Sequence, residues 1–334
     1  MATTKIRIIK INIFFFFILP NINVILYSFR VVNHELIIVR YGEISLKGKE
    51  TRKHFESILI KNIKNALKKN DISHKIVKEW GRIYVYTEQI KKSIFVLKKI
   101  FGITSISPCM QTLSEMNYIS KLSLKISKEK LTKNKSFAIR STRTGKHNFT
   151  SQDVAVKVGN DIVKVTKAIV NLTKPDFELF IEIRNDKAFI FTKKIRGVGG
   201  MPFGTQGKIL ALIDSKYSIL AAWYLIRRGC KATFIITKKS NLNVLKSFLK
   251  NWYIDSDIYD LKPGKNPIKY LNKIAHEKNC EAIVIDSSLF VKSKITLSYI
   301  KKLKKSVNLP ILHPLIAMDK KEINKKCKEI GVTL

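Results

Sequence analysis

The chain has 334 residues, enough for two or three domains that each bury a hydrophobic core. Its 63 Lys and Arg against 25 Asp and Glu give a formal net charge of +38, which favours a polyanionic partner such as a nucleic acid, although an AT-biased genome also enriches lysine. The cysteines are isolated in the sequence, which argues against a structural zinc site or a disulfide framework and fits a reducing cytoplasm. They are Cys109, Cys230, Cys280 and Cys327.

Residues 1–33 differ from the rest of the chain. Three basic residues precede an apolar run at 11–29, an arrangement typical of a signal peptide or a membrane anchor. Pro20 and three asparagines interrupt this run, so it would span a bilayer poorly. We interpret 1–33 as an N-terminal extension outside the fold and expect no membrane association; a membrane-tethered adaptor is the alternative.

A regular pattern begins at Glu35. Its elements follow in the order strand, helix, strand, strand, helix, strand, which is typical of a ferredoxin-like unit and predicts one at 34–109. We expect Ile94, Leu97 and Phe101 to face the core of this unit. The predicted strands are 36–41, 74–80, 82–87 and 103–109, and the predicted helices are 51–69 and 90–101.

The second predicted domain spans 110–196. Its centre is a strand at 137–142 with alternating side chains, followed by a cationic loop at 143–148. A helix then begins, with Thr150 or Ser151 as its cap. The remaining elements are a helix at 114–128 and strands at 177–184 and 187–193, and the capped helix should bury Val154, Val158, Ile162 and Val165.

The junction of this strand, loop and helix gathers cations and backbone N–H groups on one rim. A strand that ends in arginine, a basic turn with Gly145 and a helix N-terminus together suit a phosphate group. A solvated face of an ordinary α/β domain is the alternative interpretation of the same charges.

Several motifs in this region resemble a known family. Arg-Ser-Thr-Arg-Thr-Gly-Lys-His at 140–147, Lys-Pro-Asp at 174–176 and the glycine-rich run at 197–206 are similar to the THUMP domain of tRNA 4-thiouridine synthases, also called tRNA sulfurtransferases. The run at 40–49 resembles the opening of that family's N-terminal domain. The resemblance implies binding to the acceptor-stem region of tRNA by Lys47, Lys49, Arg140, Arg143, Lys146, His147, Asn148, Lys193, Lys194 and Arg196.

A linker at 197–206 leads to the third predicted domain, 207–334. Strands alternate with helices there, which predicts a parallel sheet covered on both faces. The whole chain is therefore expected to be an α/β and α+β multidomain protein that ends in a Rossmann-like domain of the adenine-nucleotide α-hydrolase type. The predicted strands are 208–213, 232–237 and 281–286, and the predicted helices are 219–227, 267–278, 299–305 and 320–330.

In the family, the first loop of this sheet is a pyrophosphate-binding Ser-Gly-Gly-x-Asp-Ser segment. The resemblance places Ser215 and Lys216 at the two glycines and Ser218 at the aspartate, so side chains fill the space for the phosphates and Asp214 repels them. The segment at 286–297 departs from the family as well, and the chain ends before the family's sulfur-handling cysteine. The degenerate ATP loop is Asp214, Ser215, Lys216, Tyr217, Ser218 and Ile219.

These expectations combine into one functional hypothesis. The chain is predicted to be a cytoplasmic, tRNA-binding THUMP protein that acts in tRNA thiolation without catalytic residues, a cofactor or a metal of its own, and without binding DNA. A sulfur-donor or catalytic protein and a second copy of the chain are further candidate partners. The alternative is an active ATP-dependent sulfurtransferase that uses Mg-ATP through an unusual loop and takes its sulfur from a partner.

Overall fold

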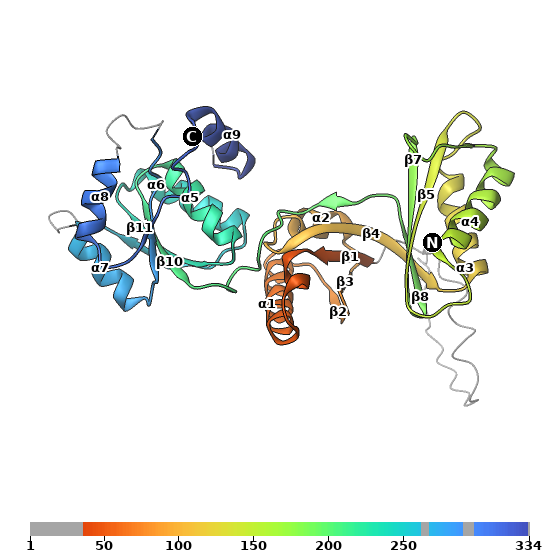
Figure 1. Ribbon diagram of the computed structural model, residues 1–334, viewed down its shortest axis with the longest axis horizontal. Helices are drawn as coiled ribbons and strands as arrows, with labels where there is room; N and C mark the ends of the chain where they lie inside the picture. The colour runs from red at the N-terminus through yellow and green to blue at the C-terminus, as the bar shows by residue number, and fades with distance from the viewer. Residues whose placement is uncertain (1–35, 262–266, 290–296, 333–334) are drawn as a thin grey trace, which may run out of the picture. The chain divides into compact units, whose positions relative to one another are not determined.

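The computed structural model describes residues 36–261, 267–289 and 297–332 (Figure 1). The predicted N-terminal extension lies outside these residues. Among the helices of the described ranges, none combines the length and the apolar character that a membrane crossing requires.

The first unit has the predicted ferredoxin-like topology. Strand β1 lies between β3 and β4, antiparallel to both, and β2 pairs with β3 at the edge. Alternation along β1 directs Ile37 and Val39 into the same core as Leu59 and Ile63 of α1. The elements are β1 (Leu36–Tyr41), the 3-10 helix η1 (Glu43–Leu46), α1 (Lys49–Lys68), β2 (Lys75–Glu79), β3 (Arg82–Tyr86) and α2 (Ile90–Leu97).

Strand β4 (Ile103–Leu113) runs through the predicted boundary between the first two domains. Its first part pairs with β1, and its last residues, Met110–Leu113, pair with β8 (Lys187–Phe191). One continuous path of strands, β2-β3-β1-β4-β8-β7-β5-β6, therefore passes through both units, and the short β9 (Ile195–Arg196) also pairs with β4. The two units share a strand as well as a chain connection.

In the second unit, α3 and α4 pack on one face of the sheet. Strand β5 runs parallel to both of its neighbours, β6 and β7. Val154, Val158 and Ile162 of α4 are fully buried as predicted, whereas Val165 is 45% exposed, so the buried stripe stops one turn before the helix ends. The elements are α3 (Met116–Lys128), β5 (Ser136–Thr144), α4 (Ser151–Thr166), β6 (Ile169–Val170) and β7 (Phe177–Arg184).

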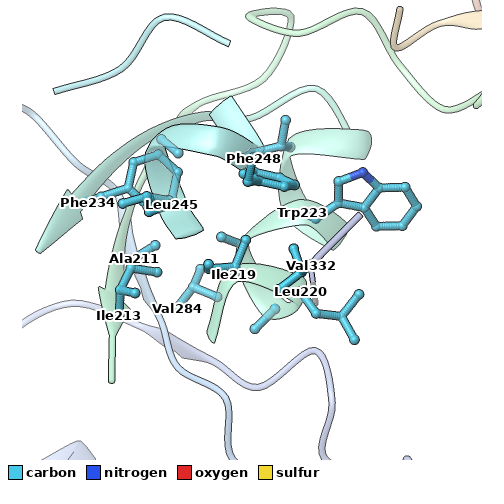
Figure 2. Close-up of a cluster of buried hydrophobic side chains, with 14 of the residues drawn as sticks. Ala211, Ile213, Ile219, Leu220, Trp223, Phe234, Leu245, Phe248, Val284 and Val332 are labelled. Atoms are coloured by element: carbon cyan, nitrogen blue, oxygen red, sulfur yellow. The ribbon is translucent and has the colours of Figure 1, made fainter. Parts of the chain in front are cut away.

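The third unit is the predicted Rossmann-like sheet. All of its strand pairs are parallel, in the order β12-β11-β10-β13-β14, and β10 is apolar on both faces because helices cover both. Side chains of α5 and α6 meet those of β10, β11 and β13 in one core (Figure 2), and α7 and α8 lie on the opposite side of the sheet (Figure 1). The elements are β10 (Lys208–Ile213), α5 (Lys216–Arg227), β11 (Lys231–Ile236), α6 (Ser240–Asn251), β12 (Ile258–Asp260), α7 (Pro267–Glu277), β13 (Ala282–Val284), α8 (Leu297–Ser306), β14 (Ile311–Leu312) and α9 (Lys320–Glu329).

The prediction that Phe101 faces the ferredoxin-like core is wrong. Helix α2 ends at Leu97, so residue 101 does not continue the helical face that carries Ile94 and Leu97. The Phe101 ring is buried instead against two tryptophans of the third unit, with its centroid 5.2 Å from that of Trp252 and 6.3 Å from that of Trp223. Burial of such large rings stabilises the contact between the two units.

Candidate nucleic-acid interface

The cationic loop between β5 and α4 is fixed by its own polar groups. Gly145 has a φ of +106°, and a Cβ atom there would lie 2.8 Å from Asn185 Oδ1, so glycine is required at this turn. Arg143 Nη1 donates to the carbonyl oxygen of Gly145 at 3.0 Å. His147 Nε2 lies 2.6 Å from the carbonyl oxygen of Asn185, which ties the loop to the turn between β7 and β8.

The N-terminus of α4 has its own cap. Thr150 Oγ1 accepts from the N–H of Asp153 at 3.1 Å, and Asp153 Oδ2 accepts from the N–H of Thr150 at 2.8 Å. These hydrogen bonds lower the pKa of Asp153, which keeps a negative charge at the helix start. The helix N-terminus therefore offers an anion less than the sequence suggests, and the attraction rests on the cations of the loop.

The predicted cations of this rim fall into two groups. Arg140 is half-buried and held within its unit, because its Nε lies 2.9 Å from Glu178 Oε1 and its Nη2 donates to the carbonyl oxygen of Leu172. Arg143 and Lys146 are exposed on the loop itself. Lys146 and the remaining N–H groups of Arg143 can contact a phosphate from the surface, whereas Arg140 would have to give up or share its bonds to Glu178 and Leu172.

A cavity of about 360 Å³ joins residues that are distant in the sequence. Arg140 and Lys194 lie in its wall, together with Ser151 and Gln152 from the first turn of α4. Lys194 Nζ lies 4.3 Å from the ring centroid of Phe180, and burial, followed by the charge of Arg40, lowers the pKa of this amine. The structure thus brings two of the predicted RNA-binding residues to one hollow.

Other predicted RNA-binding residues lie elsewhere on the surface. Lys193 and Arg196 are exposed at the end of β8 and on β9, and Asn148 is exposed on the loop. Lys47 lines a different cavity, of about 400 Å³, whose wall also holds Lys208 and Glu281, and Lys49 begins α1. The ten predicted residues therefore form more than one surface.

A buried cluster of charges, which the sequence did not predict, lies on the helix-free side of β7. Glu182 is 8% exposed in its side chain and accepts hydrogen bonds from Arg40 at 2.9 Å and Arg82 at 2.7 Å. Arg184 Nη1 lies 3.4 Å from the same carboxylate. Burial opposes the charge of Glu182, but Arg40 and Arg82 outweigh burial and lower its pKa. The alternation of charged and apolar residues in 177–184 was the only signal, and it suggests a solvated face.

The first loop of the parallel sheet is mostly the first turn of α5. Ser215 is the N-cap of this helix, and its Oγ accepts from the N–H of Tyr217 at 3.1 Å. Ser218 Oγ accepts from the N–H groups of Asp214 at 3.2 Å and Ser215 at 3.1 Å. Three N–H groups of this loop and turn, those of Asp214, Ser215 and Tyr217, are therefore paired with its serine side chains.

A carboxylate closes the loop from the neighbouring strand. Asp286, two residues beyond β13, accepts from Ser215 Oγ at 2.6 Å and from Ser218 Oγ at 3.0 Å. On the other side, Asp214 Oδ1 accepts from Thr237 Oγ1 at 3.1 Å and lies 3.5 Å from Lys238 Nζ. The loop that follows β10 therefore lies at the edge of the sheet between β10 and β13. The strand order reverses there, and open parallel sheets usually bind their ligands at such a reversal.

Three protein families match successive parts of the chain. The ThiI ferredoxin-like domain matches residues 36–107, the THUMP domain matches 114–193, and the thiamine biosynthesis protein ThiI matches 266–333. Together with the fold, these matches define a class: a THUMP-domain protein of tRNA modification, with a ferredoxin-like unit before the THUMP domain and a Rossmann-like unit after it.

Comparison with individual proteins narrows the class. The chain is 34% identical to a probable tRNA sulfurtransferase of Methanobrevibacter smithii, over 90% of this chain and 87% of that protein, and 36% identical to that of Methanocaldococcus jannaschii, over 88% and 87%. The crystal structure of a 4-thiouridine synthetase–RNA complex with bound ATP is similar, with a TM-score of 0.73 and 27% identity over 89% of this chain and 85% of that one. The chain belongs to the tRNA sulfurtransferase family.

Proposed function

We propose that the chain binds tRNA in the formation of 4-thiouridine and contacts the acceptor-stem region through its THUMP domain. The observation that carries this proposal is the cationic β5–α4 loop, with Arg143 and Lys146 exposed beside a cavity that holds Arg140 and Lys194. A similar protein has been crystallised with RNA, and the net charge of +38 favours a polyanion. Lys47, Lys49, His147, Asn148, Lys193 and Arg196 are proposed as further contacts.

Recognition should depend mainly on the shape and backbone of the RNA. The deep groove of paired RNA is too narrow for side chains to read, so proteins contact its phosphates and 2′-hydroxyl groups. Arginine and lysine on a loop that is fixed to the β7–β8 turn suit that task, because they meet phosphates without identifying a base.

Replacing Arg140 and Arg143 together by alanine should weaken binding to all tRNAs. It should also reduce the slope of log affinity against log salt concentration by about one unit per lost phosphate contact. The matched control replaces Lys301, Lys302, Lys304 and Lys305 of α8, which are exposed and which we interpret as a solvated surface. Filter binding of tRNA at several salt concentrations measures the affinity and the salt slope of each variant. A larger loss of tRNA affinity in the lysine variant would show that the binding site lies outside the THUMP domain.

We propose further that the Rossmann-like unit lacks ATP chemistry of its own. A pyrophosphate needs free N–H groups at the start of α5, but Ser215 and Ser218 already accept hydrogen bonds from that turn. Both serine hydroxyl groups in turn donate to Asp286, which holds these side chains in the space that the phosphates would need. These residues do not fit a bound nucleotide, and we assign no step of the reaction to one.

Addition of Mg-ATP should therefore leave the melting temperature of the protein unchanged, because only a ligand that binds the native state stabilises it. Differential scanning fluorimetry measures this, with tRNA as the positive control that should raise the melting temperature. A shift that saturates with ATP would overturn this part of the proposal. It would favour an active ATP-dependent sulfurtransferase whose sulfur comes from a partner protein.

Without ATP chemistry in this chain, the thiolation has to be completed by another protein. We propose a partner that supplies the activating step or the sulfur, with the present chain presenting the tRNA in the cytoplasm. Addition of such a partner to the chain and tRNA should form a ternary complex, which size-exclusion chromatography would detect.

A further inference from the structure

Trp80 is an exposed aromatic ring at the tip of the β2–β3 hairpin. Its exposed fraction is 73%, whereas Trp223 and Trp252, the other two tryptophans of the chain, are only 7% and 8% exposed. Burial of an indole ring is strongly favourable, so a ring this exposed gives up stabilisation that the fold could have used. Such a residue is a candidate for contact with a ligand.

The tip that carries Trp80 is anchored on the buried charge cluster. Arg184 Nη2 donates to the carbonyl oxygen of Trp80, while Nη1 of the same side chain faces Glu182. Gly81 follows with a φ of +74°, which closes the turn between β2 and β3. The backbone below the ring is therefore held in place, which lowers the entropic cost of stacking a ligand on the ring.

A cation lies over one face of the ring. The guanidinium carbon of Arg52, on the first turns of α1, is 5.8 Å from the Trp80 ring centroid. Lys49 and Lys53 are exposed on the same helix. The adjacent acidic residue, Glu79, has its charge compensated, because its Oε1 lies 3.0 Å from Lys187 Nζ. The surroundings of the ring thus favour a ligand that carries negative charge.

The hairpin tip and the cationic THUMP loop attach to neighbouring residues of one turn. Arg184 holds the carbonyl of Trp80, and the carbonyl of the next residue, Asn185, lies within hydrogen-bond distance of His147. The hairpin tip and the cationic loop are therefore both tied to the β7–β8 turn, although Trp80 comes from the ferredoxin-like unit.

We infer that Trp80 is a stacking platform for an unpaired base of the bound RNA, with Arg52 over one face of the ring, the base on the other face, and the cationic loop in contact with phosphates of the same RNA. An aromatic face next to cations is the combination that binds single-stranded nucleic acid, because every base has a π-face and every linkage a charge. This inference rests on the proposed binding of RNA and adds a contact to a base, which the cations alone do not provide.

Tryptophan fluorescence tests the inference directly, because Trp80 is the only strongly exposed tryptophan of the chain. A single-stranded oligoribonucleotide of about six residues, within the site size of common single-strand binders, serves as the probe. It should quench the fluorescence of the wild-type protein. Trp80→Phe should abolish that quenching and keep most of the affinity, whereas Trp80→Ala should lower the affinity about five- to a hundredfold at constant salt.

Two controls separate this inference from the proposed function. A blunt-ended RNA duplex made of two complementary strands should bind the wild-type and Trp80→Ala proteins equally, since it offers no unpaired base. Both variants should melt at the wild-type temperature, because the ring is exposed. If the oligonucleotide binds without quenching and Trp80→Ala keeps its affinity, the inference that a base stacks on Trp80 is wrong. The proposed binding of RNA is then unaffected. If no RNA binds the wild-type protein, the proposed function fails and the platform with it.

Discussion

Replacement of Glu182 by alanine is expected to lower the free energy of unfolding by about 3–5 kcal/mol, the usual cost of removing one partner from a buried ion pair. Arg40, Arg82 and Arg184 all contact this carboxylate, and their side chains are 12%, 25% and 10% exposed. Without Glu182 these guanidinium groups would remain buried with their main counter-charge removed. Chemical denaturation measures the loss.

The same strand offers a matched control. Glu178 also pairs with an arginine, Arg140, but both side chains are 38% exposed, so Glu178→Ala should cost less than about 1 kcal/mol. Since β1, β3 and β7 meet at Glu182, its loss should destabilise the ferredoxin-like and THUMP units together. Equal stability losses in the two variants would contradict the view that Glu182 holds these units together.

The effect should depend on pH with a definite sign. The folded protein holds the pKa of Glu182 below its usual value, so the charged carboxylate stabilises the fold above the unfolded pKa. That stabilisation is lost as the pH falls through the lowered folded pKa. The difference in unfolding free energy between wild type and Glu182→Ala should therefore shrink in acid, below the ordinary range of a glutamate.

Affinity for tRNA is expected to fall about a thousandfold or more between about 50 and about 200 mM salt, if about six or more phosphates are neutralised. Each neutralised phosphate releases condensed counterions, and added salt opposes that release. Arg143, Lys146, Lys193, Lys194 and Arg196 are exposed and available for such contacts.

The Trp80→Ala variant provides an internal comparison for this measurement. Stacking releases few counterions, so this variant should bind single-stranded RNA more weakly with an unchanged salt slope, whereas the Arg140/Arg143 variant should show a shallower slope. A wild-type slope of only one or two units would be inconsistent with a phosphate-binding surface of this extent.

Local sequence determined most of the architecture. The period of the apolar residues predicted β1, α1, β7 and β10 nearly to the residue, because each forms its own apolar face. The start of α4 was predicted with Thr150 or Ser151 as its cap, and Thr150 is the cap; the prediction was possible because a helix cap involves only a few consecutive residues. The THUMP motif is likewise continuous in sequence, and the family match at 114–193 confirmed it. The sequence also predicted the cations of the β5–α4 loop, although their contact with RNA stays a prediction.

Tertiary structure alone decided the contacts between distant segments. Glu182 meets Arg40 across 142 residues and Arg82 across 100, and a charged residue in an alternating strand gives no sign that a second unit covers it. Phe101 does not lie in its predicted core because α2 ends at Leu97. Its ring packs instead against tryptophans of another unit. Asp286 closed the first loop of the parallel sheet from a strand 68 to 71 residues away. Periodicity and capping describe neighbours along the chain, whereas burial, ion pairing and an exposed ring such as Trp80 depend on which surfaces the fold brings together.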